Sequence, residues 1–239
     1  AVAAIQGRAE ARDQRRMAES LVGFMLGDLR AKLEPLGRLD VLDSVGARAL
    51  EYYQSQDTSS LSDGSLARRS KALTLIGEIA NTRGDLDRAL NLYREAYAGT
   101  AEALRRDPAN PERMFDHAQN VFWVGYIAWQ RGQLGPAEAS FREYKRLAER
   151  MIALQPDKPA WRLEQQYADT NLGIVLIDLR RFAEAAAVFQ SAANVVEALA
   201  AGAPNNADYQ KMMLEALAWL STARSGEGRL EDALAQRER

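Results

Sequence analysis

The sequence contains no cysteine and only one histidine among its 239 residues. Disulfide bonds and a cysteine nucleophile are therefore excluded, and a typical zinc site, built mainly from Cys and His, cannot be assembled. His117 comes one position before an apolar stretch, and we interpret it as a partly exposed structural residue. The Gly-x-Ser-x-Gly, P-loop and Gly-x-Gly-x-x-Gly motifs are missing too. The sequence therefore predicts no enzyme, no catalytic or metal site and no cofactor.

An excess of charge of either sign is also missing, because 31 Lys and Arg face 33 Asp and Glu. No basic stripe emerges, so we expect no nucleic-acid partner. No run of 18 apolar residues occurs, so we expect no membrane insertion. The lack of cysteine does not identify the compartment. The cytoplasm is favoured, and a membrane-proximal position outside it is the alternative.

What the sequence has in abundance is internal repetition with a period of 48 residues. Gly84, Gly132, Arg180 and Gly228 are spaced by this period, and an alanine follows each of them five residues later. A small residue, an aromatic residue and a proline recur at the same spacing. These three series are Gly77, Gly125, Gly173 and Ser221; Tyr93, Phe141 and Phe189; and Pro108, Pro156 and Pro204.

Apolar residues recur at helical spacing before and after each turn, which predicts two helices, A and B, in every repeat. The glycine of the turn fits a left-handed residue that ends helix A, and the proline ends helix B. Arg180 replaces this glycine in the third repeat, so it is either left-handed, at a cost of about 1–2 kcal/mol, or the turn is rebuilt. Gly77 and Ala89 should let the two backbones approach, and Tyr93 should fill the seam to the next repeat.

The first repeat resembles the signature of the tetratricopeptide (TPR) family. The residues that carry the resemblance are Leu73, Ile76, Gly77, Ala80, Gly84, Ala89, Tyr93 and Ala96. The family period is about 34 residues, so a 48-residue variant should have longer helices of about 20 residues each. The resemblance implies an all-α fold, a superhelix of αα-hairpins (a TPR-like solenoid) preceded by a long N-terminal helix.

We expect two regions. Residues 57–239 form the TPR-like repeats, at 62–108, 109–156, 157–204 and a truncated 205–239, so the native protein should continue. Ser62 or Asp63 should cap the first of them. Residues 1–56 form an N-terminal helix up to about residue 34, a turn at Pro35 and a second helix from Leu39 to Tyr53. This pair is either a degenerate repeat or, the interpretation we favour, a cap on the solenoid.

The segment from Leu21 to Leu42 resembles the region that precedes TPRs in large bacterial signalling proteins, where a membrane helix often lies upstream. This resemblance implies that residues 1–20 form a membrane-proximal stalk.

Helices A line the concave face in the TPR family, so the resemblance also implies which residues bind a partner. They are Asn81 in the first repeat, Phe122, Tyr126 and Trp129 in the second, and Ile174 and Ile177 in the third. We call Phe122, Tyr126 and Trp129 the aromatic stripe, because their i, i+4, i+7 spacing places them on one side of a helix. The alternative is that this stripe packs inside the protein.

Three functions follow from these observations. The first is a protein–protein interaction module that binds a peptide or a partner domain on the helix-A face. The second is a structural or dimerising scaffold, or sensor region, of a larger bacterial signalling protein, with a homodimer formed through the N-terminal helix. The third is a sensor of small ligands. The Lys, Arg and Asn clamp of chaperone-binding TPRs is absent, since Thr74 and Glu78 occupy its positions, so an apolar or helical segment is the expected partner.

Overall fold

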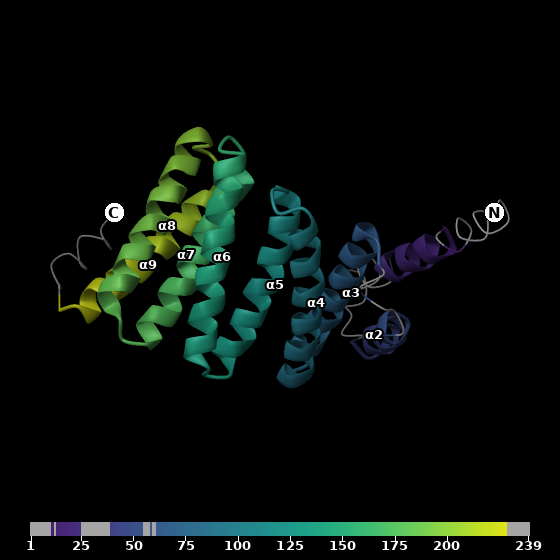
Figure 1. Ribbon diagram of the computed structural model, residues 1–239. Coiled ribbons are helices and arrows are strands. Elements are labelled where there is room, and N and C mark those ends of the chain that lie inside the picture. The colour runs from purple at the N-terminus through teal and green to yellow at the C-terminus, as the bar shows by residue number, and fades with distance from the viewer. Residues whose placement is uncertain (1–10, 12, 25–38, 55–57, 59–60, 229–239) are drawn as a thin grey trace. The chain divides into compact units, whose positions relative to one another are not determined.

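The computed structural model describes residues 11, 13–24, 39–54, 58 and 61–228, and all of its described elements are helical (Figure 1). The predicted all-α, TPR-like repeat fold is confirmed. The paired helices are α3 (Asp63–Thr82), α4 (Leu86–Arg106), α5 (Pro111–Gln130), α6 (Leu134–Leu154), α7 (Pro159–Asp178), α8 (Phe182–Gly202) and α9 (Ala207–Gly226). Each is 20 or 21 residues long, as the sequence predicts.

The chain forms two compact units, residues 1–108 and residues 109–239. In the N-terminal unit, α3 packs against α4 and against α2 (Leu39–Gln54). In the C-terminal unit, α5 to α9 pack each against the next, and α7 also contacts α9. The division between the units falls between the first and second predicted repeats. The expected boundary at residue 57 remains a prediction.

The turns between helices A and B have the conformation that the repeat predicts. Gly84 and Gly132 have φ angles of 81° and 70°, and Arg180 has a φ of 60°. The amide of Arg180 donates to the carbonyl of Ile177 at 2.8 Å, as the amide of Gly132 donates to that of Trp129 at 2.8 Å. The first alternative for Arg180 is therefore confirmed, because the turn keeps its geometry and the arginine adopts the left-handed conformation.

The small residue in helix A faces the aromatic ring of helix B in its own repeat. A Cβ atom on Gly173 would lie 2.5 Å from Cζ of Phe189, and one on Gly77 would lie 2.7 Å from Cε1 of Tyr93. Gly77 therefore makes room for a ring, and the expected close approach of the two backbones remains a prediction. Phe189 also stacks on Trp219 of the next repeat, with centroids 5.8 Å apart, so this ring does reach the seam.

α8 is the most apolar helix of the repeat stack. Among the described residues it is the one helix whose length and mean hydropathy of 1.2 would suit a membrane span. It packs between α7 and α9, with Ala185, Phe189 and Val196 fully buried. This packing accounts for the buried third of its apolar window.

The N-terminal segment is described in part. Residues 13–24 are helical, and α2 confirms the helix predicted from residue 39. Buried Glu19 accepts hydrogen bonds from Nε of Arg68 at 2.7 Å and from Oγ of Ser65 at 3.2 Å, which fixes the helix against α3. The predicted turn at Pro35, most of residues 1–12 and the fourth helix B lie outside the described residues.

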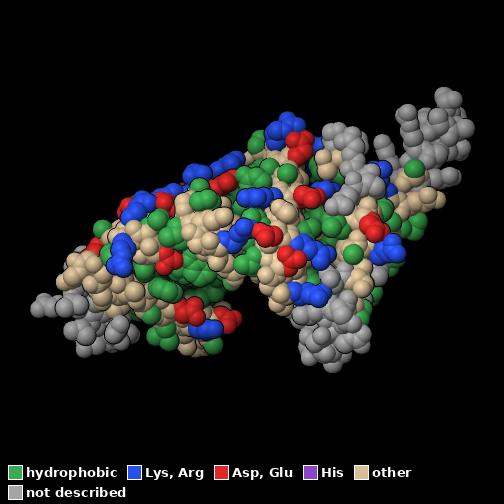
Figure 2. Space-filling model, turned by 90° about the horizontal axis from the view of Figure 1, so that it is seen from below, with side chains coloured by type: hydrophobic (Ala, Val, Ile, Leu, Met, Phe, Trp, Pro, Cys, Tyr) green, Lys and Arg blue, Asp and Glu red, His purple; other side chains and the backbone are tan. Residues whose placement is uncertain are grey.

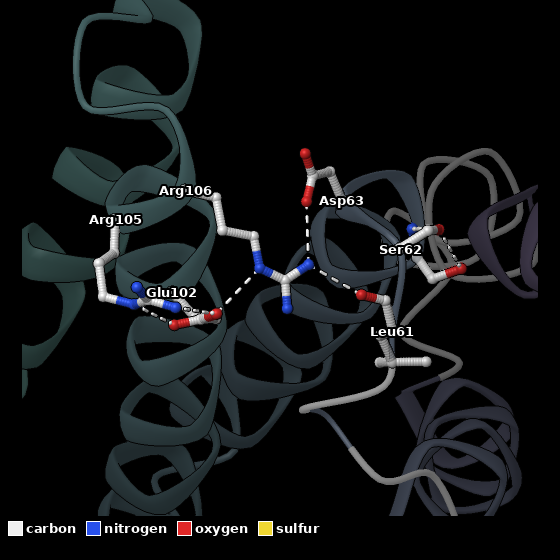
Figure 3. Close-up of polar contacts among 7 residues, drawn as sticks. Leu61, Ser62, Asp63, Glu102, Arg105 and Arg106 are labelled. Carbon is white, nitrogen blue, oxygen red and sulfur yellow. Dashed lines mark hydrogen bonds and ion pairs between the residues drawn. The ribbon is translucent and has the colours of Figure 1, made fainter.

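The start of α3 and the end of α4 are joined by an arginine (Figure 3). The Arg106 guanidinium donates to the carbonyl of Leu61 and to Asp63, both at 2.9 Å, and to Glu102 at 2.9 Å. Hydrogen bonds from Arg105 and Arg106 lower the pKa of Glu102 to about 2. Ser62 caps α3 by accepting from the amide of Ser65, which confirms the first of the two predicted caps.

Candidate functional site

The aromatic stripe forms a continuous band of rings along α5. Phe122 stacks on Tyr126 with centroids 5.7 Å apart, and Tyr126 contacts Trp129 at 5.9 Å. These separations are typical of favourable aromatic pairs, which hold one another in place. All three side chains are half-buried, so each ring keeps one part in contact with the protein and another part open to solvent.

One end of the stripe, Phe122, packs against α6. The ring of Phe122 lies 6.2 Å from that of Phe141 and 6.1 Å from that of Tyr144. The aromatic stripe therefore has features of both alternatives that the sequence left open, a partner-binding surface and internal packing. It packs against the core on one side, and it also leaves aromatic surface available on the other.

The other end of the stripe is bonded to the next repeat. Nε1 of Trp129 donates to Oδ2 of Asp178 at the end of α7, at 2.7 Å. Ile174 and Ile177 lie on the same helix, at the positions that Tyr126 and Trp129 occupy one repeat earlier, and both are half-buried. This hydrogen bond links the helices A of consecutive repeats.

The remaining expected site residue, Asn81, lies on α3 and is half-buried. It belongs to the N-terminal unit, whereas the other five expected site residues belong to the C-terminal unit. The structure brings the three residues of the stripe together and joins them to α7.

A buried carboxylate that the sequence analysis overlooked joins α5, α6 and α7. Oε2 of Glu164 accepts from the Tyr144 hydroxyl at 2.5 Å and from Nε2 of Gln119 at 2.8 Å. Burial raises the pKa of Glu164 and outweighs these two hydrogen bonds. The Tyr144 ring that contacts the stripe is therefore held in place by its hydroxyl.

A second buried acid lies nearby on the same helix. Asp169 is fully buried, and its Oδ1 accepts from Nζ of Lys145 on α6. Burial raises the pKa of Asp169, and Lys145 acts in the opposite direction. Asp169 takes the place of Leu73 in the repeat, so an ion pair replaces an apolar contact there.

The single histidine is buried, so its predicted partial exposure was wrong. His117 is 4% exposed, with Nε2 3.5 Å from Oε1 of Glu143. Arg69 and Glu95 occupy the same two positions one repeat earlier and are 3.0 Å apart. In these two repeats, a buried side chain of helix A therefore lies against an acid of helix B. The 48-residue register could have indicated the burial of His117, because His117 occupies the position of Arg69.

Two grooves are lined by residues at equivalent positions of different repeats. One, of about 500 Å³, lies between α6, α7 and α8, and the other, of about 670 Å³, lies along α3 and α4. Six lining residues of the first lie 96 residues, or two repeats, after six of the second. They are Arg162, Gln165, Ser191, Asn194, Val195 and Ala198, which follow Leu66, Arg69, Glu95, Ala98, Gly99 and Glu102. Packing of the repeat therefore accounts for both grooves.

The charged surface is mixed, with Lys and Arg interspersed among Asp and Glu on the face shown in Figure 2. Among the described residues, no three His, Asp or Glu side chains are placed so as to hold a metal ion. Glu138 illustrates the pairing of these charges. Burial alone would raise its pKa, but hydrogen bonds from Arg142 and Arg181 outweigh burial and lower it.

No protein-family model matches the sequence, and no curated protein matches it either. Several solved structures share its fold. BtubC (BKLC) from P. vanneervenii is 17% identical over 99% of this chain and 86% of that chain, with a TM-score of 0.70. A putative kinesin light chain from Podosopora anserina with nearly identical TPR-like repeats is 14% identical over 91% and 93%, with a TM-score of 0.61. The apo form of RapI is 11% identical over 90% and 67%, with a TM-score of 0.66. At these identities the similarity establishes a TPR-like helical repeat fold.

Proposed function

We propose that this chain is a protein–protein interaction module, built from a long 48-residue variant of the TPR repeat. It binds a peptide or partner domain on the helix-A face of α5 and α7, and it performs no catalysis. The half-buried aromatic stripe is the observation that carries this proposal. The TPR-like fold supports it only by analogy, since a fold does not determine a function.

The stripe has the properties of a binding hot spot. Aromatic residues dominate such spots, because a ring buries a large apolar area while losing little conformational freedom. The contacts of Tyr126 with Phe122 and Trp129 already restrict the three rings before any partner arrives. Ile174 and Ile177 extend the apolar surface across one repeat. A partner that covers these residues gains apolar contacts at a small entropic cost.

The double variant Tyr126→Ala/Trp129→Ala tests the proposal. Proteins captured by the wild-type chain from lysate of the source cells would be identified by mass spectrometry, purified and titrated against both forms. We expect the double variant to lose at least 2 kcal/mol of binding free energy, about the threshold for a hot spot. Leu154→Ala is the matched control, because Leu154 is 47% exposed at the end of α6, on a helix B.

Equal binding of a purified partner to wild type, double variant and control would exclude this surface. Far-ultraviolet circular dichroism of the double variant would establish that the repeats remain folded.

Self-association is the second candidate function, and exposed side chains on residues 13–24 favour it. Met17, Leu21 and Phe24 follow i, i+4, i+7 and are 66%, 59% and 57% exposed. Buried Glu19 on the same helix contacts α3. Light scattering should then detect a dimer in the wild type that Leu21→Glu/Phe24→Glu abolishes. A wild-type monomer at high concentration would exclude this role.

A further inference from the structure

We propose that the partner segment is basic as well as apolar, and that it places a Lys or Arg side chain against the hydrogen-bonded pair of Trp129 and Asp178. This inference rests on the proposed function and adds the chemical character of the partner. It follows from the charges on the helix-A face of the C-terminal unit and from the unusual situation of Asp178.

The helix-A face of the C-terminal unit carries one negative charge, that of Asp178, that no Lys or Arg of the described residues pairs with. Positions 6 and 3 residues before the central small residue, and 1 and 4 after it, form one side of a helix, with position 5 beside them. On α5, α7 and α9, whose central residues are Gly125, Gly173 and Ser221, these positions contain the acids Asp178 and Glu215. Glu215 pairs with Lys211, one turn earlier on α9, at 3.9 Å, so the charge without a cation is that of Asp178. This face therefore complements a basic segment.

Asp178 differs from Glu138 and Glu184, two other acids of the C-terminal unit. Glu138 and Glu184 both accept hydrogen bonds from Arg181. Asp178 is exposed, and no Lys or Arg in the described part of the chain forms an ion pair with it. Its one bonded partner is the indole of Trp129, which occupies Oδ2 and leaves the negative charge uncompensated.

The pair formed by Trp129 and Asp178 combines the two features that bind organic cations. An indole face attracts a guanidinium or ammonium group through its quadrupole, and a carboxylate adds a charge-assisted hydrogen bond. The bond from Nε1 to Oδ2, at 2.7 Å, fixes the two groups relative to each other. Tyr126 adds a second ring 5.9 Å from that of Trp129.

The other partner chemistries fit this surface less well. An acidic tail would meet the negative charge of Asp178, and Lys211 on α9 is already paired with Glu215. A wholly apolar segment would cover Asp178 and remove its water without replacing it, which is costly for a charged group. A basic side chain at one end of an apolar segment avoids both penalties.

The dimensions of the stripe define the spacing within the partner. Seven residues separate Phe122 from Trp129, which corresponds to roughly 10 Å along a helix at 1.5 Å per residue. We expect apolar side chains over Phe122 and Tyr126, and the basic side chain about two helical turns away. In a helical partner this spacing is an apolar i, i+3 or i+4 pattern with Lys or Arg near i+7.

A library of random 16-residue peptides displayed on phage tests the inference without a known partner. It would be selected on the wild-type chain and counter-selected on Tyr126→Ala/Trp129→Ala. We expect the retained peptides to be enriched in Lys or Arg next to apolar residues at the spacing given above. Synthetic versions of these peptides would then be titrated by fluorescence anisotropy.

Asp178→Asn is the critical variant, because its amide oxygen still accepts from Trp129 while the charge is lost. We expect about threefold to fivefold weaker binding, the effect of one exposed ion pair, and a smaller dependence on salt. Asp178→Glu should retain the salt dependence. Asp157→Asn, an exposed residue in the turn before α7, is the control and should bind as the wild type does.

Each outcome separates the two proposals. Peptides that depend on the stripe but show no basic enrichment, or that bind Asp178→Asn as tightly as wild type, would overturn this inference and leave the interaction function standing. A selection that yields no stripe-dependent peptide would overturn both.

Discussion

Replacing Arg180 by glycine should stabilise the protein, because Arg180 is a non-glycine residue held at a φ of 60°. The corresponding turns at Gly84, Gly132 and Gly228 have φ angles of 81°, 70° and 81°. The third repeat therefore keeps the left-handed conformation in its turn without glycine, the residue that adopts this conformation readily. Arg180 is exposed and forms no side-chain hydrogen bond or ion pair within the described part of the chain, so the substitution removes no favourable interaction.

The magnitude follows from two opposing contributions. A left-handed conformation costs a residue with a Cβ atom roughly 1–2 kcal/mol. Substitution by glycine relieves this cost, but it also destabilises the folded state by about 0.4–1 kcal/mol, since glycine adds conformational freedom to the unfolded chain. The net expectation is about 0.5–1 kcal/mol of added stability. For a chain of this size, 1 kcal/mol corresponds to a shift in Tm of roughly 2–4 °C.

Urea and thermal unfolding, followed by circular dichroism at 222 nm, would measure the difference. The reciprocal variant Gly132→Arg creates the same arrangement in the second repeat, and it should lose a similar amount of stability. If Arg180→Gly were no more stable than the wild type while Gly132→Arg was clearly destabilised, the left-handed arginine would not be a strained residue. Equal stability of all three proteins would refute the strain argument for every turn.

Three further predictions concern the core, the buried acid and the α3–α4 junction. Gly173→Ala should lower the free energy of unfolding, measured by urea titration, by about 1–3 kcal/mol, because the added methyl group would overlap the ring of Phe189. Gly202→Ala is the control and should be nearly neutral, because a Cβ atom there would meet open space. The pKa of Glu164 is raised in the folded state from its ordinary 4.5, so its stabilising contribution is complete below pH 4.5 and is lost as the pH rises through the raised value. Compared with Glu164→Gln, the wild type should therefore gain stability as the pH is lowered from 8 to 5, and a constant difference would contradict this. Arg106→Ala should raise the pKa of Glu102 from about 2 towards 4.5, measured from the carboxyl carbon by NMR, and an unchanged titration would show that Arg105 alone lowers it.

The fold could be predicted from the sequence because the repeat constrains both local and long-range structure. The 48-residue register placed the turns, and the structure begins helices A at Asp63, Pro111, Pro159 and Ala207. The left-handed alternative for Arg180 followed from the neighbouring repeats rather than from arginine itself. The contact of Gly77 with the ring of Tyr93 was not predicted, because a one-dimensional pattern shows that a position must be small but not which atoms lie against it.

The candidate site was less predictable, because exposure depends on how neighbouring helices tilt. The spacing of Phe122, Tyr126 and Trp129 showed that they share a side of one helix, but not that α6 would support Phe122 from behind. Glu164 was missed because an acid near the start of a helix usually faces solvent. Its burial depends on two donors, Gln119 and Tyr144, which lie 45 and 20 residues away along the chain.

Departures from the repeat have different meanings at its core and on its surface. Asp169 replaces a core leucine, and the structure compensates with Lys145, since a buried carboxylate without a partner would be costly. On the surface, Phe122 and Trp129 stand where the first repeat has the polar residues Thr74 and Asn81, so the repeat also folds without aromatic residues at these positions. The exposed parts of these aromatic side chains, on the face that also carries the unpaired charge of Asp178, are therefore the feature on which the proposed interaction rests.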